Sequence, residues 1–374
     1  MGKNIGIITF HASYNCGSML QTYALKHKLE NMGHTCRIIN FSNTGQQLLY
    51  SVYGKNNSLK SLIRNFIIFL FHKRIRRNFD SYEYFIQKHF EVDKNRITNI
   101  QGLSDEGFDA IITGSDQVWN ITIADGDDAY FLPWVKQAKK IAYAPSFGAK
   151  SPIVYAKDPS IYKEYLLDFD NISIRENNGK KWIKELTGLD VPVIIDPTLF
   201  HDFETYDAIR DKELKLPPKY IFYYSPGYDY AINKLVKEIS KKYNLPVIAF
   251  NSRNFYVRGM LFSGFSLPDI ENPSTYLSLI KEASMVITTS FHGTVFSSIY
   301  NKCFWTVKNG GMFGNDDRVL TLADTLRLND RLIPIEFDNN FNYLKEKDFS
   351  DFHSILIKER KKADNFLNTA IGSI

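Results

Sequence analysis

His292 stands between an apolar run and an apolar helical pattern, in the stretch TTSFHGTVFSSIY (288–300). Residues 285–289 are typical of a buried strand, and the following residues favour a helix, so the pattern predicts a histidine at a helix N-terminus. A histidine so placed can contact a phosphate and move a proton, because the helix dipole and free backbone N–H groups favour anions. The alternative is a purely structural histidine. Small and polar neighbours are candidates for the same site: Ser290, Gly293 and Thr294.

A second candidate loop, GSDQVWN (114–120), directly follows the apolar run FDAIIT. It combines an aromatic plane with carboxylate and amide groups, a set that suits a sugar ring with apolar faces and a hydroxyl rim. The alternative places the tryptophan in the core beneath the loop. The candidate residues of this loop are Asp116, Gln117, Trp119 and Asn120.

The third candidate loop, HASYNCGS (11–18), offers His11, Asn15 and Gly17 just ahead of a predicted helix. A helix start approached through glycine can hold an anion by its backbone N–H groups. The spacing matches neither the dinucleotide fingerprint nor the Walker A loop. Cys16 could act as an acid, but a filler role in packing is the favoured interpretation.

Apolar runs separated by helical patterns predict parallel sheets that position these loops. We expect a helix from the N-cap Ser18 to the stop at Gly33, and further helices over 231–243, 274–283 and 292–300. Ligands of such sheets bind where loops leave the carboxyl ends of the strands. The predicted strands are 4–10, 36–41, 108–114, 140–145, 171–176, 191–196, 219–227, 245–250, 285–289 and 303–307.

The length of 374 residues indicates two α/β domains, each doubly wound, facing a cleft. The polar stretch 201–218, which ends in Pro-Pro, predicts the boundary. We therefore expect an acceptor-side domain over 1–205, with a basic insert at 42–107, and a donor-side domain over 206–374.

The composition is that of a globular protein, with 44% hydrophobic and 23% charged residues. No secretory signal opens the sequence and no apolar run is long enough to span a bilayer. Three scattered cysteines argue against a disulfide framework and a cysteine-based zinc site. These features predict a cytoplasmic protein without a bound metal, and we place it in the cytoplasm or at the inner face of the membrane.

The positive charge is unevenly distributed: no acidic residue stands between Glu30 and Asp80, although the net charge is only +5. The core of this interval, residues 61–79, combines basic residues with an apolar, aromatic stripe. One interpretation is a buried helix with a solvated basic end. The other is a helix that lies on an anionic membrane or holds a polyanionic or lipid-linked acceptor. Nucleic acid is a poor partner, because no nucleic-acid motif accompanies the charge.

Several stretches along some three hundred residues together resemble the polysaccharide pyruvyl transferase family. The resemblance implies two Rossmann-like halves similar to a GT-B glycosyltransferase. It also implies transfer of the pyruvyl unit of phosphoenolpyruvate, the donor co-substrate, to a glycan or a lipid-linked oligosaccharide, with no other cofactor. The product would be a pyruvate ketal in a capsule, exopolysaccharide or cell-wall glycan. The stretches are ITFHASYNCGSMLQTYALKHKLENMGH, FDAIITGSDQVWN, SIRENNG, IIDPTLF and TTSFHGTVFSSIYNK.

By this resemblance, His292 matches the histidine that contacts the donor phosphate, and Arg175 in SIREN matches a donor-binding arginine. A guanidinium suits a phosphate or a carboxylate by bidentate pairing. Some members carry a second arginine two positions before the histidine, where this chain has Ser290. Arg318 is our candidate for the missing charge.

Two other classes of function compete with this interpretation. A GT-B glycosyltransferase would use the same helix N-terminus for the diphosphate of a nucleotide sugar. A non-catalytic assembly protein would keep the basic segment 61–79 without needing His292. The acidic stretch ADGDDAY (124–130) resembles a metal motif of nucleotide-sugar transferases, but we expect it to be a solvated loop.

Overall fold

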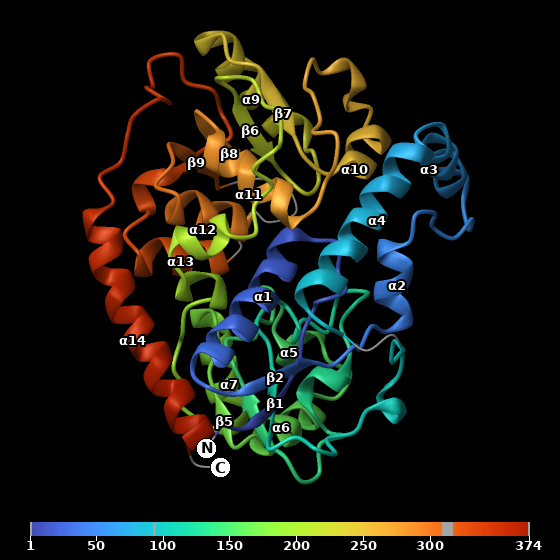
Figure 1. The fold of residues 1–374 in the computed structure, drawn as a ribbon, viewed down its shortest axis with the longest axis vertical. Coiled ribbons are helices and arrows are strands. Elements are labelled where there is room, and N and C mark those ends of the chain that lie inside the picture. The colour runs from blue at the N-terminus through green and yellow to red at the C-terminus, as the bar shows by residue number, and fades with distance from the viewer. Residues whose placement is uncertain (1, 93–94, 309–316, 373–374) are drawn as a thin grey trace.

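Two parallel sheets of five strands form the centre of the molecule (Figure 1). The computed structural model describes residues 2–92, 95–308 and 317–372. The strand order is β2-β1-β3-β4-β5 in the first sheet and β10-β9-β8-β6-β7 in the second. All strand pairs in both sheets are parallel, so the predicted α/β class with two doubly wound halves is confirmed.

The first half holds the elements that precede residue 208. Their bounds are β1 (Asn4–Ile8), α1 (Cys16–Asn31), β2 (Thr35–Ile38), α2 (Thr44–Tyr50), α3 (Leu59–Leu70), α4 (His72–His89), η1 (Ile100–Gly102), β3 (Ala110–Thr113), η2 (Asp128–Phe131), β4 (Lys139–Ala142), α5 (Pro152–Tyr155), α6 (Pro159–Leu167), β5 (Asn171–Ile172), α7 (Asn177–Thr187), η3 (Pro197–Phe200) and α8 (Phe203–Asp207).

The second half begins with β6, and its last helix returns to the first half. The bounds are β6 (Ile221–Tyr224), α9 (Tyr230–Tyr243), β7 (Val247–Ala249), α10 (Ser252–Val257), η4 (Met260–Phe262), α11 (Pro273–Glu282), β8 (Met285–Thr288), α12 (Phe291–Ile299), β9 (Phe304–Val307), α13 (Asp317–Thr325), η6 (Asn329–Arg331), β10 (Leu332–Ile333) and α14 (Ser350–Gly372).

The strands form because their apolar residues are buried on both faces of a sheet, as in most parallel sheets. Every residue of β3, β6 and β8 is buried. The prediction of a strand at 191–196 is wrong: this segment makes only one bridge, between Ile174 and Val193. Pro192 and Pro197 flank the bridge, and proline cannot donate to a ladder. The short strand β10 was not predicted.

Helix α1 begins earlier than the sequence suggested, so the assignment of Ser18 as its N-cap is wrong. Asn15 caps the helix, and its side chain accepts a hydrogen bond from Gly17 N. The predicted stop is confirmed, since the helix ends at Asn31 and Gly33 follows with a φ of 88°. Because the helix starts earlier, the Ser18 hydroxyl does not cap it and instead donates to Asp116 in the loop after β3.

The two halves share one hydrophobic core, which contains Ile7 and Leu20 of the first half together with Phe222 and Phe296 of the second. Helices α4 and α14 span the halves on opposite flanks (Figure 1). On one flank, Arg360 of α14 donates to Leu199 O. The sheets therefore lie in two halves that pack closely against each other.

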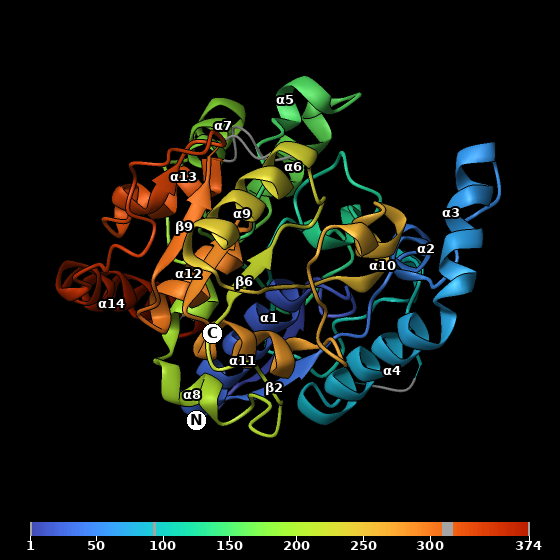
Figure 2. The ribbon, with the colours of Figure 1, turned by 90° about the horizontal axis from the view of Figure 1, so that it is seen from above.

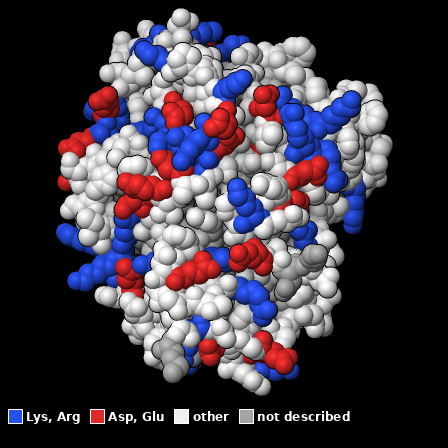
Figure 3. Space-filling model, in the orientation of Figure 1, with Lys and Arg blue, Asp and Glu red and all other residues white. Residues whose placement is uncertain are grey.

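The basic segment 61–79 belongs to two helices, α3 and α4, rather than to one. Helix α4 is amphipathic: its first turns pack on the second half and its last turns on α1. Helix α3 lies at the outer edge of the molecule in both ribbon views (Figures 1 and 2). On this side, Lys and Arg side chains border an uncharged lobe at the upper right of Figure 3. Within the described ranges, the helices are too short or too polar to cross a bilayer.

Candidate active site

A cluster of charged side chains lies where the carboxyl ends of the two sheets face each other. The first half contributes residues from the loops after β3 and β5, from the start of α1 and from the start of η3. The second half contributes residues from the start of α12 and of α13. The members of the cluster are Ser18, Asp116, Arg175, Glu176, Asp196, His292 and Arg318, all of them buried.

Arg175 lies at the centre of this cluster and is 4% exposed. Its Nη1 is 2.7 Å from Asp196 Oδ2, and its Nη2 is 3.5 Å from Asp116 Oδ1. The guanidinium carbon lies 4.7 Å from the centre of the Phe291 ring, a cation–π contact across the two halves. Nε and Nη2 nevertheless have no hydrogen-bond acceptor. Buried donors are almost always paired in folded proteins, so these two are available to an anionic ligand.

His292 lies in the first turn of α12, where the sequence predicted it, and is 7% exposed. Its Nε2 is 3.5 Å from Asp196 Oδ2, an ion-pair distance that leaves this nitrogen without a hydrogen-bond partner. On the other edge of the ring, a Cβ on Gly17 would lie 2.1 Å from Nδ1. Glycine is therefore required at position 17 by the close approach of the α1 backbone to the histidine ring.

Two aspartates neutralise the cations of this cluster. Burial alone would raise the pKa of Asp196, but His292 and Arg175 outweigh it and hold that pKa well below its usual value. Asp116 behaves alike: burial opposes ionisation, while Arg175 and His292 lower its pKa, and the Ser18 hydroxyl donates to it. Both carboxylates are thus ionised at neutral pH and orient the side chains of Arg175 and His292.

Glu176 is a third buried carboxyl group, next to Arg175 in the chain. Burial raises its pKa to about 7, although Arg175 and Arg318 act in the opposite direction. Oε1 accepts from Ser146 Oγ and Phe147 N, whereas Oε2 has no hydrogen-bond partner. A carboxyl group with a pKa near neutrality and a free oxygen can donate or accept a proton.

A sequence model of the polysaccharide pyruvyl transferase family matches residues 15–311, which contain the whole cluster except Arg318. The chain belongs to this family. No curated protein sequence matches the chain significantly.

Solved structures of low sequence identity share the GT-B-like fold of this family member. A Staphylococcus aureus MnaA–UDP complex aligns over 100% of this chain and 98% of its own, with 11% identity and a TM-score of 0.53. A putative UDP-N-acetylglucosamine 2-epimerase from Listeria monocytogenes aligns over 99% and 90%, with 7% identity and a TM-score of 0.50. At these identities, the likeness shows the fold alone.

Arg318, the candidate for the missing charge, lies within electrostatic reach of the cluster. It is 6% exposed at the start of α13 and lowers the pKa values of Asp116 and Glu176. Most of the GNDDRV stretch before it lies outside the described residues. Two cations from the first and second half, Arg175 and Arg318, thus lie near the same carboxylates.

The other predicted residues of α12 shape its N-terminus. Ser290 caps the helix by accepting from Gly293 N at 3.3 Å. A Cβ on Gly293 would lie 2.3 Å from Thr288 Oγ1, so glycine permits the close packing of helix and strand. Thr294 is fully buried and its hydroxyl lies 2.7 Å from that of Thr306. These side chains position His292.

Four predicted residues are not members of the charged cluster. Two are buried in the core, and the other two form a hydrogen bond within their own loop. Trp119 is fully buried and stacks on Phe131, which is the alternative placement in the core. His11 is also fully buried, and its ring nitrogens face Asn40 Oδ1 and Thr9 O. Burial lowers the pKa of His11 to about 4. The other two residues form a hydrogen bond with each other, in which Asn120 Nδ2 donates to Gln117 Oε1.

Two further predictions concern Cys16 and the acidic stretch 124–130. Cys16 packs in the core, and burial raises the pKa of its thiol. The acidic stretch is not a solvated loop, so that prediction is wrong. Asp125 is 5% exposed, Asp127 caps η2, and Tyr130 is fully buried. The described ranges contain no group of three His, Cys, Asp or Glu side chains that could hold a metal.

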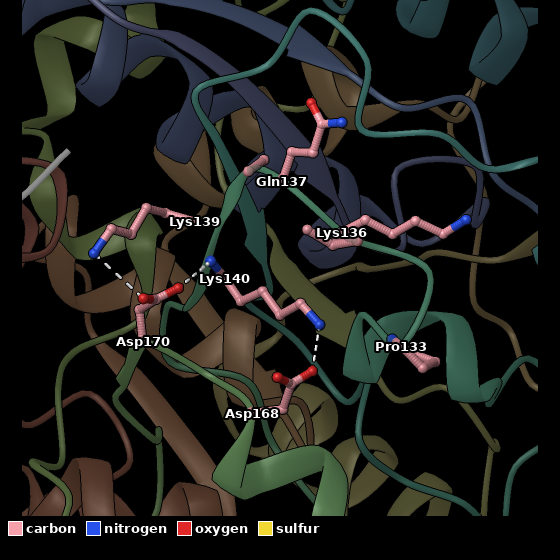
Figure 4. A pocket seen from close by; sticks show the side chains of 9 residues that line it. Pro133, Lys136, Gln137, Lys139, Lys140, Asp168 and Asp170 are labelled. Carbon is pink, nitrogen blue, oxygen red and sulfur yellow. Dashed lines mark hydrogen bonds and ion pairs between the residues drawn. The ribbon is translucent and has the colours of Figure 1, made fainter.

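Two hollows lie at the amino ends of strands, away from the cluster. One, of about 490 Å³, lies beside the start of β4, and Figure 4 shows two of its three lysines paired with aspartates. Lys139 contacts Asp170 at 3.3 Å and Lys140 pairs with Asp168. The other, of about 640 Å³, is lined by residues such as Lys302. Neither hollow is lined by charged side chains from both halves, as the cluster around Arg175 is.

Sequence reasoning missed Asp196, Glu176 and Phe291 as members of the site. Asp196 and Glu176 lie in the stretches IIDPTLF and SIREN, which had been noted for their resemblance only. The signal available was an acidic residue at the end of an apolar run followed by proline, or directly after the donor-binding arginine. Their significance depends on tertiary contacts that no local pattern indicates.

Proposed function

We propose that the protein transfers the pyruvyl group of phosphoenolpyruvate to a sugar of a glycan or lipid-linked oligosaccharide, and forms a cyclic ketal. The main support is that Arg175 Nε, Arg175 Nη2 and His292 Nε2 are buried donors without acceptors. The side chains of Arg175 and His292 both lie against the Asp196 carboxylate, in a member of the polysaccharide pyruvyl transferase family. A small dianionic or trianionic donor provides the acceptors that these nitrogens lack.

The donor is held by cations from both halves in this proposal. Arg175 binds one anionic group of phosphoenolpyruvate by its planar guanidinium, and His292 binds the phosphate at the N-terminus of α12. Arg318 adds a second arginine near the same carboxylates. The donor therefore lies between the halves rather than within the second half alone.

The reaction has a simple proton balance. The methylene carbon of phosphoenolpyruvate gains one proton, and two sugar hydroxyls each lose one. Two C–O bonds to the sugar form at the central carbon, while the bond from that carbon to the phosphate oxygen breaks. The second hydroxyl proton leaves with the phosphate, so no external oxidant or reductant is required.

His292 and Glu176 are the groups that move these protons in the proposed mechanism. His292 Nε2 faces the donor and protonates the methylene carbon or the leaving phosphate. Glu176, with a pKa raised to about 7 by burial, takes part in proton exchange beside Arg175. Asp116 and Asp196 stay ionised and stabilise positive charge that develops at the central carbon.

Product analysis tests the proposed reaction. The purified protein is incubated with phosphoenolpyruvate and with lipid-linked oligosaccharides extracted from the source cells. We expect the acceptor to gain the mass of one pyruvyl ketal, with release of one phosphate per transfer, and His292→Ala to abolish both. A gain of one sugar mass from a nucleotide sugar, without a reaction of phosphoenolpyruvate, would contradict the proposal and support a glycosyltransferase.

A further inference from the structure

Helix α3 exposes a continuous apolar stripe to solvent. Leu59 is 74% exposed, Phe66 62% and Phe69 66%. The spacing of three and four residues places these side chains on one face of the helix. The complete stripe consists of Leu59, Leu62, Ile63, Phe66, Phe69 and Leu70.

The opposite face of α3 is firmly attached to the second half. Ile68 is fully buried there in a cluster with residues such as Ile221. The ring of Phe71, just after the helix, stacks on that of Tyr256 at 3.8 Å. Ser58 and Ser61 form a capping box at the start. These contacts fix the orientation of α3, which lies at the outer edge of the molecule (Figure 2), so its exposed apolar stripe is part of the fold.

The surroundings of the stripe are basic. Lys55, Lys60 and Lys73 are exposed beside it, and no acidic residue stands between Glu30 and Asp80. Figure 3 shows Lys and Arg side chains around the uncharged lobe that α3 forms. The arginines of α4 serve other contacts: Arg74 donates to Leu267 O and Pro268 O, Arg76 pairs with Asp80, and Arg77 donates to Asp269 O. The lysines are therefore the charges available to an external partner.

We propose that α3 lies flat on an anionic membrane surface, with its apolar stripe at the boundary between headgroups and acyl chains. An amphipathic helix with a basic margin binds lipid by burial of its apolar face and by attraction to anionic headgroups. The three lysines contact the headgroups, and the second half holds α3 in position. This contact goes beyond the proposed reaction and does not depend on it.

Charge decides between a membrane and a second copy of the chain as the partner. Two copies that met through α3 would bring two sets of lysines of like sign together. The interval from Glu30 to Asp80 offers no acidic residue inside it to compensate them. An anionic bilayer supplies both the apolar layer and the opposite charge.

Helix α4 connects this surface with the candidate active site. It continues from α3 after Phe71, and its Tyr82 hydroxyl lies 3.4 Å from Cys16 Sγ at the start of α1. The next residue of α1, Gly17, contacts the His292 ring. A membrane-bound α3 is thus one helix away from the cluster, a suitable arrangement for an acceptor that carries a lipid.

Vesicle sedimentation tests the proposal with the full chain. The vesicles contain phosphatidylglycerol mixed with phosphatidylcholine. The double variant Phe66→Ser, Phe69→Ser removes two exposed rings without touching the buried face. We expect it to bind the vesicles more than about tenfold more weakly, given the free energy of burying two aromatic side chains. The control Val154→Ser, Ile357→Ser changes two similarly exposed side chains on α5 and α14, and should bind like the wild type.

A second variant separates the electrostatic contribution. Replacing Lys55, Lys60 and Lys73 by Gln should weaken binding about fivefold for each lysine, because a basic residue near an anionic surface contributes ~1 kcal/mol. Binding should also fall as salt is added and should be weak to vesicles of phosphatidylcholine alone. Titration with phosphoenolpyruvate should give the same affinity for all these variants, which separates this proposal from that of the donor.

Three results would overturn the proposal. The first is that the wild type does not sediment with anionic vesicles. The second is equal binding of the wild type and the Phe66→Ser, Phe69→Ser variant. The third is a dimer in sedimentation velocity that the double variant converts to a monomer, since it would assign the stripe to a second copy of the chain.

Discussion

The candidate active-site cluster consists of buried side chains, all but Ser18 ionisable, that orient one another. Arg175 is fixed by Asp196 and Asp116, and Asp196 also faces His292. The Asp196 carboxylate is held in turn by Thr198 N and Oγ1 at 3.0 and 2.7 Å. Such an arrangement keeps the donors of Arg175 and His292 in place before a ligand binds, which lowers the free-energy cost of ordering them.

Because Gly17 lies so close to the His292 ring, we expect that adding a single methyl group at position 17 strongly reduces activity. In Gly17→Ala, the new Cβ would lie 2.1 Å from Nδ1, so the histidine ring must move. A misplacement of about 1 Å at a reacting group costs about 100-fold in rate, and we expect such a fall in kcat/KM for phosphoenolpyruvate. Steady-state kinetics checks this.

Gly372→Ala is the matched control, because a Cβ at this position would meet no atom within 4 Å. This variant should retain full activity. Unchanged kinetics in Gly17→Ala, with the protein folded, would show that the close contact with His292 has no role in turnover.

The raised pKa of Glu176 predicts a pH-dependent difference in stability. Its pKa of about 7 in the folded protein exceeds the ordinary value of 4.5, so the folded state holds this proton more tightly. Its contribution is complete below pH 4.5 and is lost as the pH rises through 7. Relative to Glu176→Gln, the free energy of unfolding of the wild type should fall over this range by about 3 kcal/mol. Denaturant titrations at several pH values measure it.

Glu271→Gln provides the control for a role of Glu176 in proton transfer. Burial also raises the pKa of Glu271 to about 7, but this residue bonds to Ser252 beside α4. Both variants should change the pH dependence of stability, whereas only Glu176→Gln should change the pH profile of kcat. An identical kcat profile in the wild type and Glu176→Gln would exclude Glu176 from proton transfer.

His292, Arg175 and Asp116 could be predicted as site residues from their sequence surroundings, and the structure brings them together. Residue type and loop position indicated His292 and Asp116, because loops at the carboxyl ends of parallel strands converge. Arg175 was indicated by the family resemblance. Trp119 and His11 lie in similar loops, but their side chains turn into the core. Sequence patterns locate the loop and do not determine the direction of each side chain within it.

The cluster residues lie at the ends of helices and strands, so their positions depend on where each element begins or stops. Helix α12 begins shortly after the end of β8, and Ser290, in the short connection between them, is the N-cap of the helix. The strands and long helices were predictable because burial imposes periodic apolar patterns. The exceptions have physical causes: the apolar run 191–196 is interrupted by Pro192, and the start of α1 depends on which of two polar residues, Asn15 or Ser18, caps the helix.

The Ser290 cap predicts a modest loss of stability. Ser290→Ala leaves Gly293 N without its acceptor and should lower the free energy of unfolding by about 1 kcal/mol, with donor affinity reduced and not abolished. Ser290→Asp retains an acceptor and should restore the stability. Urea denaturation of the three proteins measures the difference. An Ala variant as stable as the wild type would show that the cap hydrogen bond contributes nothing.

We expect the whole molecule to behave as one packed unit, because the largest of its hydrophobic clusters extends through both halves. Helices α4 and α14 reinforce this contact on opposite flanks, with the Lys28–Asp364 ion pair at 2.6 Å on the side of α14. The near-complete burial of Arg175, Asp116 and His292 follows from this close packing. Two halves could be predicted from chain length, but their shared core depends on long-range contacts.

A shared core predicts that the halves unfold together. Differential scanning calorimetry should give one transition with a calorimetric enthalpy close to the van't Hoff enthalpy, as for a cooperative unit. Saturation with phosphoenolpyruvate at 100 times its dissociation constant should stabilise the protein by about 2.7 kcal/mol. Two resolved transitions, of which only one responds to the ligand, would contradict a common core.

Isothermal titration with phosphoenolpyruvate tests whether the cluster around Arg175 and His292 is the donor site. We expect the wild type to bind phosphoenolpyruvate, and His292→Ala and Arg175→Lys to lose this binding. The controls are His353→Ala, an exposed histidine bonded to Asn301, and Arg37→Lys, which lies 4.6 Å over the Phe108 ring. Both should bind like the wild type. Binding of a nucleotide sugar without binding of phosphoenolpyruvate, or equal donor affinity in His292→Ala and the wild type, would contradict the assignment.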